Sequence, residues 1–148
     1  MSKHLDLILR GGIAATPNGI APCDIGVRDG RIVALGAVDG DAAETIDAKG
    51  LHILPGVIDT QVHFREPGLE HKEDLESGTR SAVLGGVTAV FEMPNTSPPT
   101  TDVDAIEDKV DRATGRAWCD FAFFAGASRC SVSCNSVPPL PSVMNCLG

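Results

Sequence analysis

The strongest constraint on the fold of this chain is a β-branched run that ends on reactive polar side chains. Residues 57–63 are predicted to form a strand, and proline–glycine pairs on both sides of it mark turns. Side chains alternate between the two faces of a strand. One side is therefore expected to carry Asp59, Gln61, His63 and Arg65. If the strand belongs to a parallel barrel, its carboxyl end lies at the mouth, where such folds place active sites.

Residues 55–128 alternate between predicted strands and predicted helices, which is typical of parallel βα units. The expected strands cover residues 57–63, 87–93 and 121–125, and the expected helices cover residues 72–84 and 103–114. Asp102 is expected to cap the second helix, and Gly85 and Gly115 are expected to end the two helices. A complete (β/α)₈ barrel needs about 250 residues. We therefore predict an α/β chain that holds the first units of a truncated TIM-type barrel.

Residues 1–54 show a different pattern and are predicted to form a small β module with a supporting role. The expected strands cover residues 5–9, 20–27, 31–35, 45–46 and 51–54. Asp29 and Gly30 lie between two apolar runs, which is a strong signal for a tight hairpin. Almost nothing in this part of the chain has helical periodicity.

Residues 129–148 do not continue the βα pattern. From Cys130 to Gly148 the chain has no charged residue and is rich in serine, proline and cysteine. An amphipathic helix is expected at this point, but prolines interrupt the segment and no period persists. We interpret residues 129–148 as an aberrant, disordered tail of frameshifted or foreign origin. A genuine flexible tail is the alternative.

Charge and composition exclude several classes of partner. The formal net charge is -8, whereas nucleic acids and anionic membranes recruit proteins through clustered lysine and arginine. No run approaches the 18 or so apolar residues of a membrane span, and the first residues do not resemble a signal peptide. The five cysteines are an odd number, which favours reduced thiols. A cytoplasmic location is the expectation.

Three side chains at the predicted barrel mouth are candidates for chemistry. His63 is flanked by Arg65, whose planar guanidinium suits a carboxylate. Asn95 follows the second predicted strand, and its amide can both donate and accept hydrogen bonds. Each residue has a purely structural alternative: a satisfied histidine, an ion pair from Arg65 to Glu66 or Glu70, and an Asx turn at Asn95.

Residues 50–102 resemble the N-terminal part of a dihydroorotase of the amidohydrolase superfamily, in the group that also contains allantoinases and hydantoinases. The matching stretches are residues 55–59, 62–68, 73–79, 85–88 and 93–96. Residues 1–54 similarly resemble the β-sandwich that such enzymes build from both ends of the chain. The likeness covers about residues 3–128 and fails afterwards.

The resemblance implies reversible hydrolysis of L-dihydroorotate to N-carbamoyl-L-aspartate, a step of pyrimidine biosynthesis, at one or two zinc ions. A metal ion in such a site polarises the carbonyl and supplies hydroxide near neutral pH. By resemblance, His63 is a metal ligand, and Arg65 and Asn95 hold the substrate carboxylate. Arg65 favours a dihydroorotase, because an allantoinase more often lacks an arginine at this position.

The chain departs from the family pattern in two ways. Gln61 stands where the family usually has the first of two histidines, and a neutral amide is a poor zinc ligand compared with imidazole. The bridging carboxylated lysine, the later histidines and the general-base aspartate lie, in the family, beyond the matched part. No catalytic residue is therefore assigned, and the 148-residue chain alone is expected to be inactive.

Two other functions remain open. In the first, the parent protein is an allantoinase or a hydantoinase. In the other it is a non-catalytic dihydroorotase homologue that supports a transcarbamoylase, a reading that Gln61 motivates. A homo-oligomer is also left open. With only about three of the eight strands of a barrel, the chain alone would expose sheet edges, which predicts poor solubility.

Overall fold

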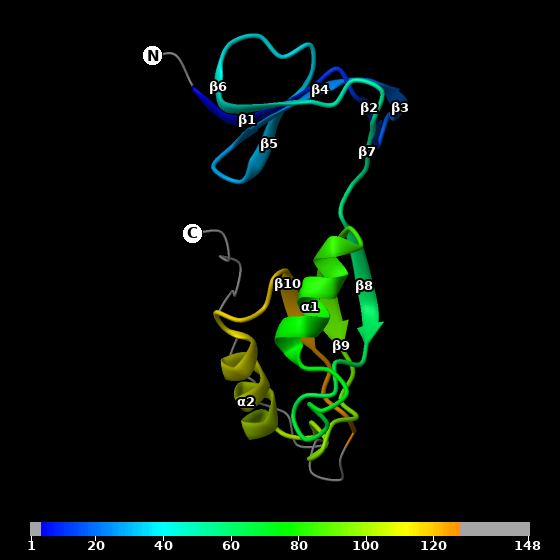
Figure 1. Cartoon of the computed structure of the whole chain (residues 1–148), viewed down its shortest axis with the longest axis vertical. Coiled ribbons are helices and arrows are strands. Elements are labelled where there is room, and N and C mark those ends of the chain that lie inside the picture. The colour runs from blue at the N-terminus through cyan, green and yellow to red at the C-terminus, as the bar shows by residue number, and fades with distance from the viewer. Residues whose placement is uncertain (1–3, 128–148) are drawn as a thin grey trace. The chain divides into compact units, whose positions relative to one another are not determined.

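The computed structural model describes residues 4–127 of the 148-residue chain (Figure 1). The chain divides after Pro55 into two compact units. The first unit contains only strands, whereas the second combines strands with helices. The predicted mixed α/β class is confirmed, although the described residues do not form a complete barrel. The predicted aberrant tail, residues 129–148, lies outside the described residues.

The first unit contains two sheets. Its strands are β1 (Leu5–Arg10), β2 (Ile13–Thr16), β3 (Gly19–Pro22), β4 (Asp24–Arg28), β5 (Arg31–Gly36), β6 (Ala42–Asp47) and β7 (His52–Ile53). One sheet has the order β5-β4-β1-β6, and the other has the order β3-β2-β7. The larger sheet buries Leu5 and Ile8 against Val38. These contacts give the first unit a small core of its own.

The turn between β4 and β5 has the predicted geometry. Asp29 and Gly30 both have positive φ angles, 51° and 67°, as a two-residue hairpin of type I′ requires. The strand predicted over residues 20–27 is wrong, because the chain turns at Cys23 and forms β3 and β4 in two different sheets. Strand β2 was not predicted, because its alanine-rich sequence carries only a weak strand signal.

The second unit is a parallel sheet with two helices. Its elements are β8 (Val57–Val62), α1 (Leu75–Leu84), β9 (Val87–Glu92), α2 (Val103–Ala113) and β10 (Asp120–Phe123). The strand order is β10-β9-β8, and both pairings are parallel. Phe64, Leu75, Val90 and Ala113 form the buried core. The carboxyl ends of all three strands therefore lie at one edge of the sheet.

Side-chain caps decide where the two helices begin. Asp74 accepts a hydrogen bond from Ser77 N at 2.7 Å, and Ser77 Oγ in turn accepts one from Asp74 N. Helix α1 therefore begins at Leu75, three residues later than predicted, because this capping box closes its first turn. The predicted caps Asp102 and Gly85 are confirmed. Within the described residues, no helix is long and apolar enough to cross a membrane.

Substituting Asp74 tests the start of α1. The hydrogen bond from Ser77 N lowers the pKa of Asp74 below the ordinary aspartate value of 3.8. A depressed pKa means that the cap contributes above the ordinary value and is lost as the pH falls through the depressed one. Asp74→Ala should therefore cost about 1 kcal/mol of unfolding free energy near pH 7, and the cost should shrink in strong acid.

The measurement is urea unfolding followed by the fluorescence of Trp118, which is the only tryptophan and lies in the second unit. The control is Glu73→Ala, which removes a neighbouring carboxylate that takes no part in the cap. A cost for Asp74→Ala that is equal to that of the control would contradict the assigned role.

A buried ion pair, which was not predicted from the sequence, joins α2 to β9. Helix α2 has two buried residues, of which one is the apolar Ala113 and the other is Lys109. Lys109 Nζ lies 3.1 Å from Glu92 Oε2, and both side chains are at most 2% exposed. Burial raises the pKa of Glu92, while the charge of Lys109 acts in the opposite direction.

Candidate functional site

The loops that follow β8 and β9 meet at the carboxyl edge of the sheet. Met93 N donates to Val62 O at 3.0 Å, so the first residue after β9 is bonded to the last residue of β8. Further along, Ser97 N donates to Pro67 O at 3.0 Å. The approach is close, because a Cβ atom added at Gly68 would lie only 2.0 Å from Ser97 O. The two loops therefore form one joined surface.

His63 and Asn95 are brought together by these loops. His63 Nδ1 lies 2.8 Å from Asn95 Oδ1. The imidazole is half-buried and the amide is exposed. The Asx turn considered for Asn95 is absent from the described residues, because the side-chain oxygen contacts the imidazole and not its own loop. The juxtaposition expected from the carboxyl ends of neighbouring strands is present.

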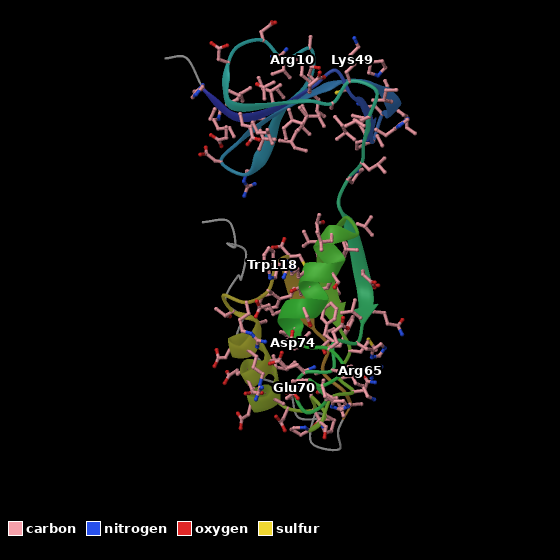
Figure 2. All side chains as sticks on the ribbon, in the orientation of Figure 1. Arg10, Lys49, Arg65, Glu70, Asp74 and Trp118 are labelled. Atoms are coloured by element: carbon pink, nitrogen blue, oxygen red, sulfur yellow. The ribbon has the colours of Figure 1, made fainter. Side chains whose placement is uncertain are left out.

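Arg65 lies in the same loop as His63, but the alternation of side chains along a strand does not determine where it points. Strand β8 ends at Val62, and Arg65 has a left-handed backbone with a φ of 68°. The expectation that Arg65 shares a strand face with His63 is therefore wrong, because the chain has already left the sheet. Figure 2 shows Arg65 and Glu70 at the end of the second unit that carries the loops.

The carboxylates considered as partners of Arg65 pair with other residues. Glu66 binds Arg116, and Glu70 lies 3.9 Å from Arg112. Within residues 4–127 the guanidinium of Arg65 takes part in no ion pair. No carboxylate of the described residues therefore competes with an anionic ligand for the charge of Arg65.

Glu66 anchors the loop from its buried side, a role that was not predicted from the sequence. The residue is 3% exposed. Its two carboxylate oxygens accept hydrogen bonds from Arg116 Nη1 at 2.9 Å and Arg116 Nη2 at 3.3 Å. Oε2 also accepts from Leu75 N, the first residue of α1. The bonds from Arg116 to Glu66 raise the pKa of Arg116, and together with the bond from Leu75 N they tie the loop to the start of α1 and to the segment just after α2.

The described residues supply only part of a metal site. Gln61 is exposed near the end of β8, and its backbone N–H donates to Asp59 Oδ1. Residues 4–127 contain no group of three or more His, Cys, Asp or Glu side chains placed to hold a metal ion. His63 supplies the only imidazole in the cluster formed by His63, Arg65 and Asn95, so this part of the chain does not fit zinc by itself.

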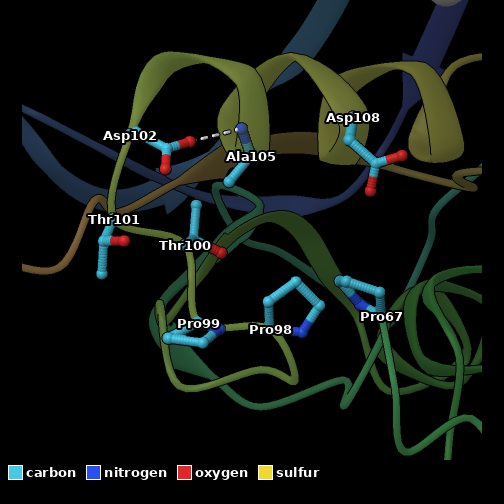
Figure 3. A pocket seen from close by; sticks show the side chains of 8 residues that line it. All are labelled: Pro67, Pro98, Pro99, Thr100, Thr101, Asp102, Ala105 and Asp108. Atoms are coloured by element: carbon cyan, nitrogen blue, oxygen red, sulfur yellow. Dashed lines mark hydrogen bonds between the residues drawn. The ribbon is translucent and has the colours of Figure 1, made fainter.

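A hollow lies at the start of α2 (Figure 3). Its volume is about 370 Å³, and it is lined by Pro67, Pro98, Pro99, Thr100, Thr101, Asp102, Ala105 and Asp108. The two acidic side chains are engaged, since Asp102 caps α2 and Asp108 binds Arg112 Nε at 2.7 Å. The three candidate residues of the cluster do not line it. The hollow therefore adds no reactive group to the site.

Comparison with known proteins places this geometry in a family. A family model described as dihydro-orotase-like matches residues 50–125. The allantoinase of Rubrobacter xylanophilus is 47% identical over 123 residues, which cover 82% of this chain and 27% of the relative. The allantoinase of Escherichia coli O1:K1 is 43% identical over 122 residues, with the same coverage of 82% and 27%. The chain thus spans about a quarter of the length of these curated relatives.

Solved structures agree with the sequence comparisons. The L-hydantoinase of Arthrobacter aurescens superposes with a TM-score of 0.78 at 38% identity, over 82% of this chain and 28% of that one. The D-hydantoinase of a Thermus species gives a TM-score of 0.66 at 27% identity, over 80% of this chain and 27% of that one. The chain belongs to the dihydro-orotase-like family, in the amidohydrolase group of dihydroorotases, allantoinases and hydantoinases.

Proposed function

We propose that the protein to which residues 4–127 belong hydrolyses a cyclic amide that carries a carboxylate, with L-dihydroorotate as the substrate. The observation that supports this choice is the guanidinium of Arg65, which has no ionic partner within the described residues and lies in the same loop as His63. Dihydroorotate bears a carboxylate, whereas allantoin is an uncharged ureide. A guanidinium binds a carboxylate through charge-assisted hydrogen bonds that fix its orientation.

The roles proposed for the cluster follow from its donors and acceptors. Arg65 binds the substrate carboxylate, and Asn95 donates to it through its amide N–H₂ group. Water adds to the ring carbonyl, the ring C–N bond breaks, and the product is N-carbamoyl-L-aspartate. A zinc ion, when bound, polarises that carbonyl and lowers the pKa of the attacking water. His63 is the one ligand that we propose from this part of the chain, and the other ligands must come from outside residues 4–127.

Allantoinase or hydantoinase activity is the second candidate, supported by the names of the curated relatives and of the solved structures. A non-catalytic homologue that supports a transcarbamoylase is a third, because Gln61 replaces an expected imidazole. A homo-oligomer and a transcarbamoylase partner are further proposals, which rest on the family resemblance.

The first experiment defines the protein to be assayed. The gene is sequenced past codon 128, translated in three frames and compared with the intact mass of the expressed chain. The longest product is then assayed with dihydroorotate, allantoin and a hydantoin, with and without added zinc. Turnover of dihydroorotate supports the proposal, and turnover of allantoin alone rejects it. The 148-residue chain should be inactive with all three substrates.

Arg65→Met distinguishes the two enzymatic candidates. If Arg65 binds the substrate carboxylate, its loss should lower kcat/KM for dihydroorotate about 10–100-fold, because a hydrogen bond to a charged group contributes roughly 1.5–3 kcal/mol. Steady-state kinetics of the full-length product provide the measurement. The control is Arg31→Met, which removes an exposed arginine in the first unit. Equal kcat/KM values for the two variants would contradict the role of Arg65.

A further inference from the structure

The contact between His63 and Asn95 constrains the protonation of the imidazole. A neutral imidazole carries one proton, on either Nδ1 or Nε2. His63 Nδ1 lies 2.8 Å from Asn95 Oδ1, which can only accept a hydrogen bond. The contact is therefore a hydrogen bond when Nδ1 carries the proton. In that tautomer Nε2 keeps the lone pair, which is the form in which an imidazole accepts a proton or binds a metal ion.

The same contact also determines what Asn95 offers to a ligand. Its side-chain oxygen is occupied by the imidazole, so the part that remains is the N–H₂ group, which only donates. Arg65 likewise only donates, because a guanidinium has no acceptor atom. The two residues therefore favour a ligand group rich in acceptor atoms, such as a carboxylate.

The backbone around Asn95 holds the amide in this position. Thr96 N and Thr100 N both donate to Pro94 O, at 3.0 Å and 2.9 Å. Ser97 N donates to Pro67 O in the neighbouring loop. Asn95 thus lies on a loop that hydrogen bonds fix on both sides, so its side chain can impose an orientation on the imidazole.

We propose that Asn95 is a positioning residue that holds His63 in the Nδ1–H tautomer, which leaves Nε2 as an acceptor and the Asn95 amide as a donor toward the substrate. This inference rests on the proposed function, to which it adds the protonation and orientation of His63. The tautomer itself is a property of this chain that can be measured without turnover. Failure of the hydrolysis assay and failure of the tautomer assignment are therefore distinguishable.

The test is nitrogen NMR of the 148-residue chain labelled with ¹⁵N-histidine, recorded near pH ~9, well above the ordinary imidazole pKa of about 6.5. Couplings from the ring carbons' protons to the two nitrogens report which nitrogen is protonated. The exposed rings of His52 and His71 serve as internal references, because neither has a hydrogen-bond partner within residues 4–127. If the chain precipitates, the same assignment is made on the sediment by solid-state NMR.

Two variants separate the positioning role from mere proximity. Asn95→Ala removes the acceptor, so the excess of the Nδ1–H form at His63 should fall about fivefold, the ratio that one hydrogen bond of ordinary net strength produces. Asn95→Asp keeps an acceptor oxygen and should retain the excess, although it no longer offers the N–H₂ donor.

The outcomes are decisive in both directions. An Nδ1–H excess at His63 that survives in Asn95→Asp and falls about fivefold in Asn95→Ala supports the proposal. A wild-type His63 with the same tautomer ratio as His52 and His71 overturns it, as does an excess that persists in Asn95→Ala. Because Asn95 is exposed, its variants should fold, and unchanged Trp118 fluorescence checks this.

Discussion

Lys109→Met is expected to cost about 3–5 kcal/mol of unfolding free energy in the second unit, because it leaves the carboxylate of Glu92 buried without its partner. Lys109 Nζ lies 3.1 Å from Glu92 Oε2 and 3.4 Å from Met93 O. Glu92 Oε1 is buried and has no hydrogen-bond partner within the described residues. The loss is large beside the 5–15 kcal/mol or so that stabilises an ordinary domain.

The measurement is urea unfolding followed by Trp118 fluorescence, which reports on the second unit alone. Lys72→Met is the matched control, since Lys72 is exposed. The double variant Lys109→Met with Glu92→Leu should recover most of the loss, because replacing both charges by apolar groups is often neutral or stabilising. A small loss for Lys109→Met, equal to that of Lys72→Met, would show that the pair does not form.

The second large effect is expected for Gly68→Ala, at about 2–5 kcal/mol of unfolding free energy. Gly68 has a φ of 96°, which disfavours any residue with a Cβ atom. The added Cβ would also lie 2.0 Å from Ser97 O, a backbone atom that can move only with its loop. The substitution should therefore push the loop of Asn95 away from the loop of His63 and break their hydrogen bond.

Gly86→Ala is the matched control for Gly68→Ala. Gly86 lies in the same unit with a φ of 89°, but a Cβ added there meets no atom within 4 Å. It should show only the backbone penalty, about 1–2 kcal/mol. Urea unfolding gives both costs, and NMR of labelled histidine reports the His63 contact. Equal costs, with the His63 signal unchanged in both variants, would refute the close approach of the two loops.

Local sequence determined the elements and the kinds of side chain at the mouth. The hairpin at Asp29 and Gly30, the cap at Asp102 and the end of α1 at Gly85 were all predictable, since each depends on residues a few positions apart. The meeting of His63 with Asn95 was also predictable, because parallel neighbouring strands bring their carboxyl ends to one edge. The family group could be recognised from short motifs in the same stretch.

Only the tertiary structure decided which charged side chains form ion pairs and which remain free to bind a ligand within the described residues. Lys109 carries no local signal of burial, yet the packing of α2 on the sheet buries it against Glu92. Glu66 and Arg116 are 50 positions apart, so no local pattern could pair them. That pairing engages Glu66 and leaves the guanidinium of Arg65 without that partner. Ion pairs of this kind depend on distances between elements, which only the packed fold determines.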